Sequence, residues 1–243
     1  MIHLLAPVDW LLVALLALGL PLRAWLAMRR LNAATDAEAT ALRPHLWARA
    51  MGTQWLLAAA VLLQWKVQHR PFATLWLAPG LTWGAGGVVL GLALMALVLQ
   101  PQRTNLAATP DVLERLRGRL ANVRKLLPVT RAEWPGFVPL ALTAGICEEL
   151  LFRGFLLWVL AHLLPSWWLA ALVQAALFGV AHLYQGPRGV LTTFFVGAFL
   201  TGVVWISGSL WPAMLAHALL DLNAGDLAIR AAELPEGAAA KRA

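Results

Sequence analysis

Long apolar segments recur along the chain, each long enough to cross a lipid bilayer as a helix. A membrane span needs about 20 consecutive, mostly apolar residues, and a helix satisfies its backbone hydrogen bonds within itself. Of the 243 residues, 60% are hydrophobic and 13% are charged, whereas soluble domains carry about 25% charged residues. The sequence therefore predicts an all-α fold, a polytopic transmembrane helical bundle. The predicted spans are 7–27, 47–65, 80–100, 136–160, 166–184, 189–207 and 210–229.

The stretch before the third span leaves the number of membrane helices at seven or eight. Residues 72–81 are also largely apolar, and Pro79-Gly80 can divide one long segment into an interfacial piece and a span. The single Cys147 excludes an internal disulfide framework and a cysteine-based metal cluster. We interpret this cysteine as a packing residue.

The distribution of basic residues predicts the orientation of the bundle. Of the 19 Lys and Arg residues, only Lys66 and Arg70 fall in loops predicted on one side, and nearly all the others fall on the opposite side. The positive-inside rule then places the N-terminus outside and the C-terminus in the cytoplasm. We expect an integral protein of a bacterial inner membrane. The net charge of +7 is a property of these loops and gives no indication of nucleic-acid binding.

One basic loop has the pattern of an amphipathic helix. Apolar residues recur at helical spacing between about 110 and 127, among Arg and Lys residues. Such a segment is typical of a helix on an anionic membrane surface. We predict a basic amphipathic helix on the cytoplasmic leaflet, serving either as a lipid-held connector or as a gate for substrate. The apolar positions are Val112, Leu113, Leu116, Leu120, Val123, Leu126 and Leu127.

Charged residues within the fourth predicted span are the strongest indication of function. Glu148, Glu149 and Arg153 lie inside this apolar segment, where each charge costs about 2.5–3.5 kcal/mol on insertion scales. The i,i+4 spacing of Glu149 and Arg153 puts them on one helix face, where they can pair. Glu148 is rotated by about 100° from Glu149. We therefore predict that Glu149 is structural and that Glu148 is left free for chemistry.

Further ionisable residues lie in the later spans. His182 ends an apolar run, and His217 and Asp221 are spaced i,i+4 on the last span. The helical rise brings these groups and Glu148 within about a dozen Å of one another in depth. His162 lies near the outer end of its helix, and we interpret it as interfacial.

These residue types suit hydrolysis of a carbonyl compound without a Ser or Cys nucleophile. A buried carboxylate can act as a base toward water, and a histidine can hold the same water. A second histidine can donate toward a developing oxyanion. Glu148, His182 and His217 are also suitable ligands for a catalytic zinc ion. No His-Glu-x-x-His motif is present, and the two alternatives remain open at this point.

The ordered motifs resemble the CPBP family of intramembrane proteases, which includes CAAX prenyl proteases and Abi bacteriocin-immunity proteins. The likeness covers about residues 136–225 and includes the flanks 152–154 and 208–217. The motifs that carry it are Glu148-Glu149-x-x-x-Arg153, Phe178-x-x-x-His182 and His217-x-x-x-Asp221.

The resemblance implies a peptidase in which Glu148 activates water and His182 positions it. Glu149, Arg153 and Phe178 would support the site. His217 and residue 221 would form the oxyanion side. The family often has Asn where this chain has Asp221, and an ionised carboxylate cannot donate a hydrogen bond. Asp221 then either stays protonated or serves to orient His217. Family members have been described both as metalloproteases and as metal-independent glutamate proteases. We expect the glutamate type with no cofactor, zinc being the alternative.

The implied organisation has three parts. Residues 1–130 form N-terminal transmembrane helices and the amphipathic loop, residues 131–232 form a CPBP-type catalytic core, and residues 233–243 form a flexible tail. The expected partners are the lipid bilayer and a membrane-associated peptide or protein, including lipidated, CAAX-like substrates. Two alternatives are a non-catalytic immunity or scaffold protein that binds peptides in the same cavity, and a proton-coupled transporter. A transporter is disfavoured by the short chain without an inverted repeat.

Overall fold

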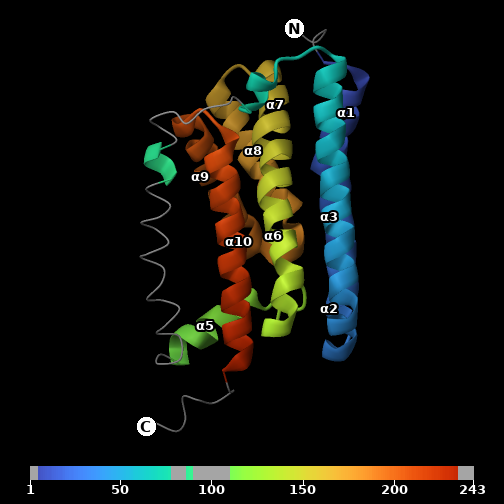
Figure 1. The fold of residues 1–243 in the computed structure, drawn as a ribbon, viewed down its shortest axis with the longest axis vertical. Coiled ribbons are helices and arrows are strands. Elements are labelled where there is room, and N and C mark those ends of the chain that lie inside the picture. The colour runs from blue at the N-terminus through green and yellow to red at the C-terminus, as the bar shows by residue number, and fades with distance from the viewer. Residues whose placement is uncertain (1–4, 78–85, 90–109, 235–243) are drawn as a thin grey trace.

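The computed structural model describes residues 5–77, 86–89 and 110–234. Within these ranges the regular elements are helices, and the long ones run side by side along the molecule (Figure 1), which confirms the predicted all-α bundle. In chain order the elements are α1 (Pro7–Ala14), the π-helix η2 (Leu15–Gly19), α2 (Leu20–Ala33), α3 (Asp36–Val67), the 3-10 helix η3 (Phe72–Leu75), α5 (Pro110–Leu120), the 3-10 helix η4 (Arg131–Glu133), α6 (Trp134–Glu149), the π-helix η5 (Leu150–Leu156), α7 (Leu157–Leu163), α8 (Trp167–Ala181), the 3-10 helix η6 (Leu183–Gln185), α9 (Gly186–Ser207) and α10 (Leu210–Glu233).

The lengths of the helices suit an integral membrane protein. Pro7–Ala33, Asp36–Val67 and Leu183–Ser207 are each long and apolar enough to cross a membrane. The elements α6, η5 and α7 follow one another directly, as the predicted span 136–160 requires. The predicted span 80–100 lies outside the described residues except for a short helical stretch at 86–89. The choice between seven and eight membrane helices depends on this span and therefore stays a prediction.

The predicted amphipathic helix is shorter than its sequence pattern indicates. Helix α5 ends at Leu120, residues 121–126 form turns, and residue 127 is a bend. The carbonyl oxygens of Lys125 and Leu126 accept hydrogen bonds from Arg43 Nε and Trp47 Nε1, both at 2.9 Å. Side chains of α3 therefore bind this segment in a turn conformation, which the spacing of its apolar residues does not encode.

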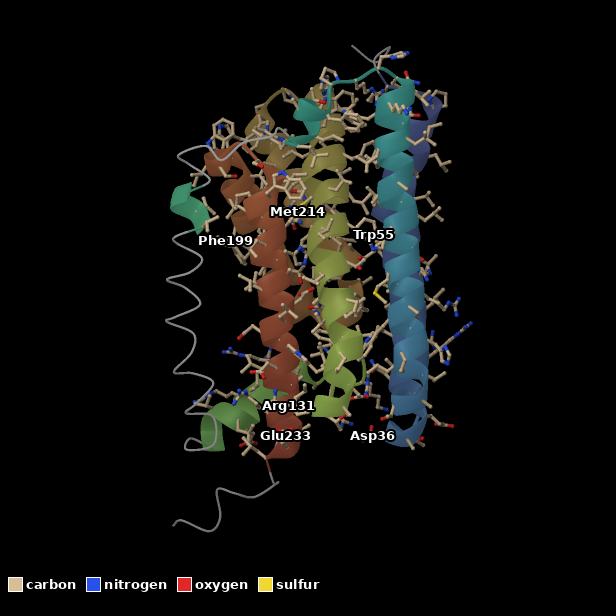
Figure 2. All side chains as sticks on the ribbon, in the orientation of Figure 1. Asp36, Trp55, Arg131, Phe199, Met214 and Glu233 are labelled. Carbon is tan, nitrogen blue, oxygen red and sulfur yellow. The ribbon has the colours of Figure 1, made fainter. Side chains whose placement is uncertain are left out.

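Charged side chains hold the helices together at one end of the bundle. Asp36, Arg131 and Glu233 lie at the lower end of the molecule in Figure 2. Arg131 Nη1 lies 2.9 Å from Asp226 Oδ1 on α10, and its Nε lies 3.5 Å from Glu233 Oε1. Arg117 of α5 donates to the carbonyl oxygens of residues 231 and 234, at 2.8 and 2.5 Å. Helix α5 thereby satisfies carbonyl groups that the C-terminus of α10 leaves unpaired.

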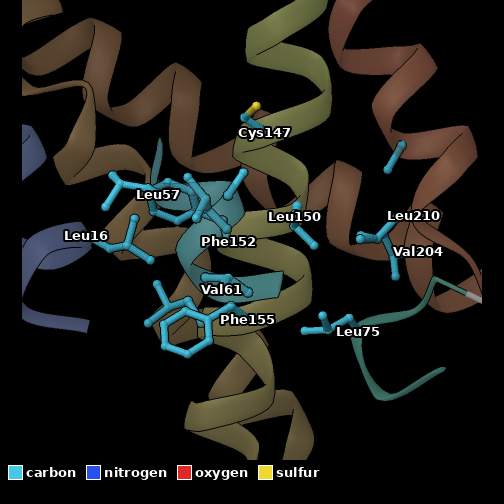
Figure 3. Packing of buried hydrophobic residues seen from close by; sticks show 14 of the residues in the cluster. Leu16, Leu57, Val61, Leu75, Cys147, Leu150, Phe152, Phe155, Val204 and Leu210 are labelled. Atoms are coloured by element: carbon cyan, nitrogen blue, oxygen red, sulfur yellow. The ribbon is translucent and has the colours of Figure 1, made fainter. Parts of the chain in front are cut away.

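The hydrophobic core is centred on η5. Every residue of Leu150–Leu156 is buried, and Phe152 and Phe155 pack with Leu57 and Val61 of α3 in the cluster drawn in Figure 3. Cys147 is a free cysteine in the same cluster, in agreement with its predicted packing role. π-Helical segments occur frequently at functional sites, and this one directly follows Glu149.

Helices α6 and α10 approach closely because α6 carries a glycine at their contact. A Cβ atom on Gly145 would lie 2.8 Å from the Cβ atom of Ala218 and 2.8 Å from the carbonyl oxygen of Met214. Any larger residue would push the two helices apart. This approach brings the end of α6 next to the middle of α10.

A buried ion pair joins the first helix to the end of α3. Asp9 is fully buried, and its Oδ1 and Oδ2 atoms accept hydrogen bonds from Arg70 Nη1 and Nη2 at 2.9 and 2.6 Å. The Arg70 guanidinium also lies 4.9 Å from the ring centroid of Trp65 and 4.7 Å from that of Trp158. Bidentate pairing and cation–π contacts of this kind are among the stronger polar interactions.

We expect Asp9→Asn to lower the free energy of unfolding by about 1.5–3 kcal/mol, the usual value for a hydrogen bond to a charged group. The measurement is denaturant unfolding in detergent. Asp36→Asn is the matched control, because Asp36 pairs with Arg124 while 67% of its side chain is exposed, and exposed pairs contribute little. Equal effects of the two substitutions would contradict a structural role for the Asp9 pair.

Candidate active site

A buried ion pair connects Glu149 and Arg153. Both side chains are fully buried, and Arg153 Nη1 donates to Glu149 Oε1 at 2.9 Å. This confirms the pairing predicted from the i,i+4 spacing. Arg153 Nη2 also donates to the carbonyl oxygen of Gly197 on α9 at 3.1 Å. The guanidinium therefore ties η5 to α9 while it neutralises the carboxylate.

The ring of Phe178 lies among the polar residues of the site. The Arg153 guanidinium lies 4.0 Å from its centroid, and the imidazoles of His182 and His217 lie 4.8 and 5.9 Å from it, centroid to centroid. Phe152 packs against the same ring at 5.0 Å. Phe178 thus packs against the guanidinium and both imidazoles and restricts how the imidazole rings can turn.

His217 is oriented by Glu149. Its Nδ1 atom lies 2.7 Å from Glu149 Oε1, and a carboxylate only accepts hydrogen bonds, so Nδ1 carries the proton. The Nε2 atom lies 4.0 Å from Glu148 Oε2 and 3.8 Å from Asp221 Oδ2. One alternative from the sequence was that Asp221 orients His217; in the structure the residue at Nδ1 is Glu149, and Asp221 lies on the Nε2 side.

His182 is oriented by the backbone of its own helix. It follows the last residue of α8, and its Nδ1 atom lies 2.9 Å from the carbonyl oxygen of Phe178. A carbonyl oxygen accepts, so Nδ1 donates, and Nε2 of the neutral ring is an acceptor. This Nε2 atom lies 3.8 Å from Glu148 Oε2.

The two carboxylate oxygens of Glu148 have different surroundings. Oε1 accepts a hydrogen bond from Gln54 Nε2 at 2.8 Å. Oε2 is buried, has no hydrogen-bond partner among the described residues, and faces Nε2 of both His182 and His217. Separations of 3.8 and 4.0 Å are too long for direct hydrogen bonds, but a water molecule can bridge such groups.

A tetrahedral zinc ion would need these three ligand atoms to lie closer together than they do. Tetrahedral zinc holds oxygen and nitrogen ligands at about 2.0–2.2 Å, so their mutual separations are about 3.3–3.5 Å. The measured separations from Glu148 Oε2 are 3.8 and 4.0 Å. Among the described residues, no group of three or more His, Cys, Asp or Glu side chains is arranged to hold a metal ion.

Glu148, His182, His217 and Asp221 lie together in the structure. Asp221 lies at the rim of this group, with 38% of its side chain exposed. His162 contacts the carbonyl oxygen of Trp158 on its own helix and is not part of the group.

Gln54 is the contact residue that sequence analysis did not identify. It lies on α3, 94 positions before Glu148. The available signal was its amide group within the largely apolar predicted span 47–65. Uncharged polar residues in membrane helices commonly hydrogen-bond across helices, but the sequence does not indicate with which partner.

Comparison with family models finds a match to part of the chain. Residues 130–223 match the model described as type II CAAX prenyl endopeptidase Rce1-like. The matched segment contains the four converging residues and excludes Gln54. No curated protein and no solved structure matches the chain.

Proposed function

We propose, from the match of residues 130–223 to the Rce1-like model of type II CAAX prenyl endopeptidases, that the protein hydrolyses a peptide bond of a membrane-associated substrate with water activated by Glu148. The observation that carries the proposal is the position of Glu148 Oε2, which lies 3.8 and 4.0 Å from the Nε2 atoms of two histidines. A water molecule within hydrogen-bond distance of all three atoms is poised for attack.

The mechanism assigns one role to each polar atom around that water. The water donates one hydrogen bond to Glu148 Oε2 and the other to Nε2 of His182. As the water oxygen attacks the peptide carbonyl carbon, Glu148 takes the proton. The same proton then passes to the amide nitrogen as the C–N bond breaks, so a new carboxyl end and a free amine leave the site.

His217 stabilises the oxyanion that forms during this attack. An imidazolium held at Nδ1 by Glu149 presents Nε2–H to the developing negative charge. Arg153 balances the charge of Glu149, so the buried group of two carboxylates, one guanidinium and one imidazolium carries no net charge. In this scheme Glu149, Arg153 and Phe178 are positioning residues, and Asp221 at the rim contacts His217 or the substrate.

The proposed substrate is a peptide at the membrane, and a C-terminal prenylated peptide is the class that the family description names. We also propose that the N-terminus is outside and the C-terminus is in the cytoplasm of a bacterial inner membrane, because basic residues are concentrated in alternate loops. Substrate then enters from the cytoplasmic side.

A cleavage assay on a peptide library, with purified protein in liposomes and with or without chelator, tests this function. We expect cleavage of at least one lipidated or membrane-bound peptide, unchanged by chelator, and a rate about 10²–10⁴-fold lower in His182→Ala. His162→Ala is the matched control, because His162 lies outside the site.

Three results would contradict the proposal. Binding of peptides without turnover would favour the scaffold alternative. A parental rate in His182→Ala would remove that residue from the mechanism. Loss of activity with chelator, restored by zinc, would show that a metal ion and not Glu148 activates the water.

A further inference from the structure

Gln54 of α3 contacts the carboxylate that the proposed mechanism uses as its base. Its Nε2 atom donates to Glu148 Oε1 at 2.8 Å. A carboxylate only accepts hydrogen bonds, so the nitrogen of the amide must face it. The other carboxylate oxygen, Glu148 Oε2, has no hydrogen-bond partner in the described part of the chain. Within that part, the carboxylate of Glu148 therefore receives its hydrogen bond from Gln54.

This hydrogen bond sets the rotation of the carboxylate. The terminal torsion of a glutamate side chain is soft, with broad minima, so packing alone does not direct Oε2 at a reacting water. With Oε1 held by α3, Oε2 is directed toward Nε2 of His182 and His217.

Helix α3 is itself fixed against the catalytic part of the bundle. Trp55, the next residue, donates from its indole Nε1 to the hydroxyl of Thr143 on α6 at 3.2 Å. Nearer the start of α3, Trp47 packs edge-on against Phe137 of α6 with ring centroids 5.7 Å apart. Gln54 therefore lies on a part of α3 that is anchored to α6 on both sides.

A second buried oxygen lies on the same residue. Gln54 Oε1 is buried and has no hydrogen-bond partner among the described residues, as is the case for Glu148 Oε2. Leaving a buried acceptor unpaired is unfavourable. Two such acceptors on contacting side chains favour a site that receives hydrogen-bond donors, such as water or a peptide N–H.

We propose that Gln54 is a positioning residue for Glu148, so that a helix outside residues 130–223 completes the active site. The inference rests on the proposed function, because positioning has meaning only if Glu148 is the base. It assigns the N-terminal helices a direct part in turnover, in addition to anchoring the protein in the membrane.

The test compares kcat and KM of three variants on a peptide that the parent cleaves. Gln54→Met keeps the length of the side chain and removes the donor, and Gln54→Leu also removes the donor with a different apolar side chain. We expect both to lower kcat by about 100-fold, the loss typical of a misplaced catalytic group, with KM nearly unchanged. Gln64→Met is the matched control on the same helix, because Gln64 contacts Asp9 and lies outside the site.

The outcomes separate this inference from the proposed function. Parental kcat in both Gln54 variants, with Glu148→Gln inactive, would overturn the role of Gln54 alone. Parental activity in Glu148→Gln would overturn the proposed function and the inference together. If Gln64→Met loses as much kcat as the Gln54 variants do, the loss comes from general destabilisation of the bundle, and the inference is also overturned. If Gln54→Met does not fold, Gln54→Leu carries the same expectation.

Discussion

Glu148→Gln is expected to lower kcat for peptide cleavage by about 10²–10⁴-fold, the usual contribution of a general base. The substitution preserves the shape of the side chain, and the new amide oxygen can still accept the hydrogen bond from Gln54 Nε2. The amide cannot take a proton from water, so the chemical step is lost while substrate binding remains. KM should therefore change much less than kcat.

The measurement is steady-state cleavage by parent and variant, together with thermal unfolding of both in detergent. Glu114→Gln is the control, because Glu114 is an exposed carboxylate on α5. We expect the control to cleave at the parental rate and Glu148→Gln to unfold at nearly the parental temperature. A variant that cleaves within a few-fold of the parental rate would show that another group activates the water.

Contacts within one helix were predictable from the sequence. The i,i+4 spacing of Glu149 and Arg153 is sufficient to predict their pairing, since helical geometry places them on one face. Their ion pair in the structure measures 2.9 Å. The burial of charged groups in apolar segments likewise indicated which side chains share a site, because isolated charges in a membrane are unfavourable.

Contacts between helices were not predictable in the same way. Which face of α6 turns toward α10 depends on the close approach at Gly145. Because of this packing, the Nδ1 atom of His217 contacts the carboxylate of Glu149 and not that of Asp221. Gln54 and Glu148 are 94 positions apart, and no spacing rule relates residues so distant. Such partners become visible only when the packing of the helices is known.

Periodicity also overestimated one element. The apolar residues of the loop keep a helical spacing to residue 127, yet α5 ends at Leu120. Arg43 and Trp47 bind carbonyl oxygens beyond that point, and these side chains come from a helix far earlier in the chain. The spacing of apolar residues in one segment predicts which face of a helix would be apolar. It does not show which side chains elsewhere in the chain donate hydrogen bonds to the backbone carbonyl groups of that segment.

Arg153→Met is expected to lower the free energy of unfolding by about 3–5 kcal/mol, the cost of removing one partner of a buried ion pair. Methionine fills much of the same volume, so the effect reports the lost charge more than a cavity. Glu149 then loses its guanidinium partner, and the carbonyl oxygen of Gly197 loses the hydrogen bond from Arg153. Cleavage should also fail, because Glu149 holds His217 at Nδ1.

A double-variant cycle separates charge from packing. Glu149→Gln with Arg153→Met removes both charges, and we expect it to regain much of the stability that Arg153→Met loses, because pairs replaced together often cost little. Cleavage should stay low in the double variant, since an amide does not balance an imidazolium at position 217.

Arg124→Met is the control: the Arg124 side chain is 56% exposed, and its pair should contribute less than about 1 kcal/mol. If Arg153→Met costs no more than Arg124→Met, the buried pair does not stabilise the bundle, and a stability role for Arg153 must be abandoned even if cleavage is lost.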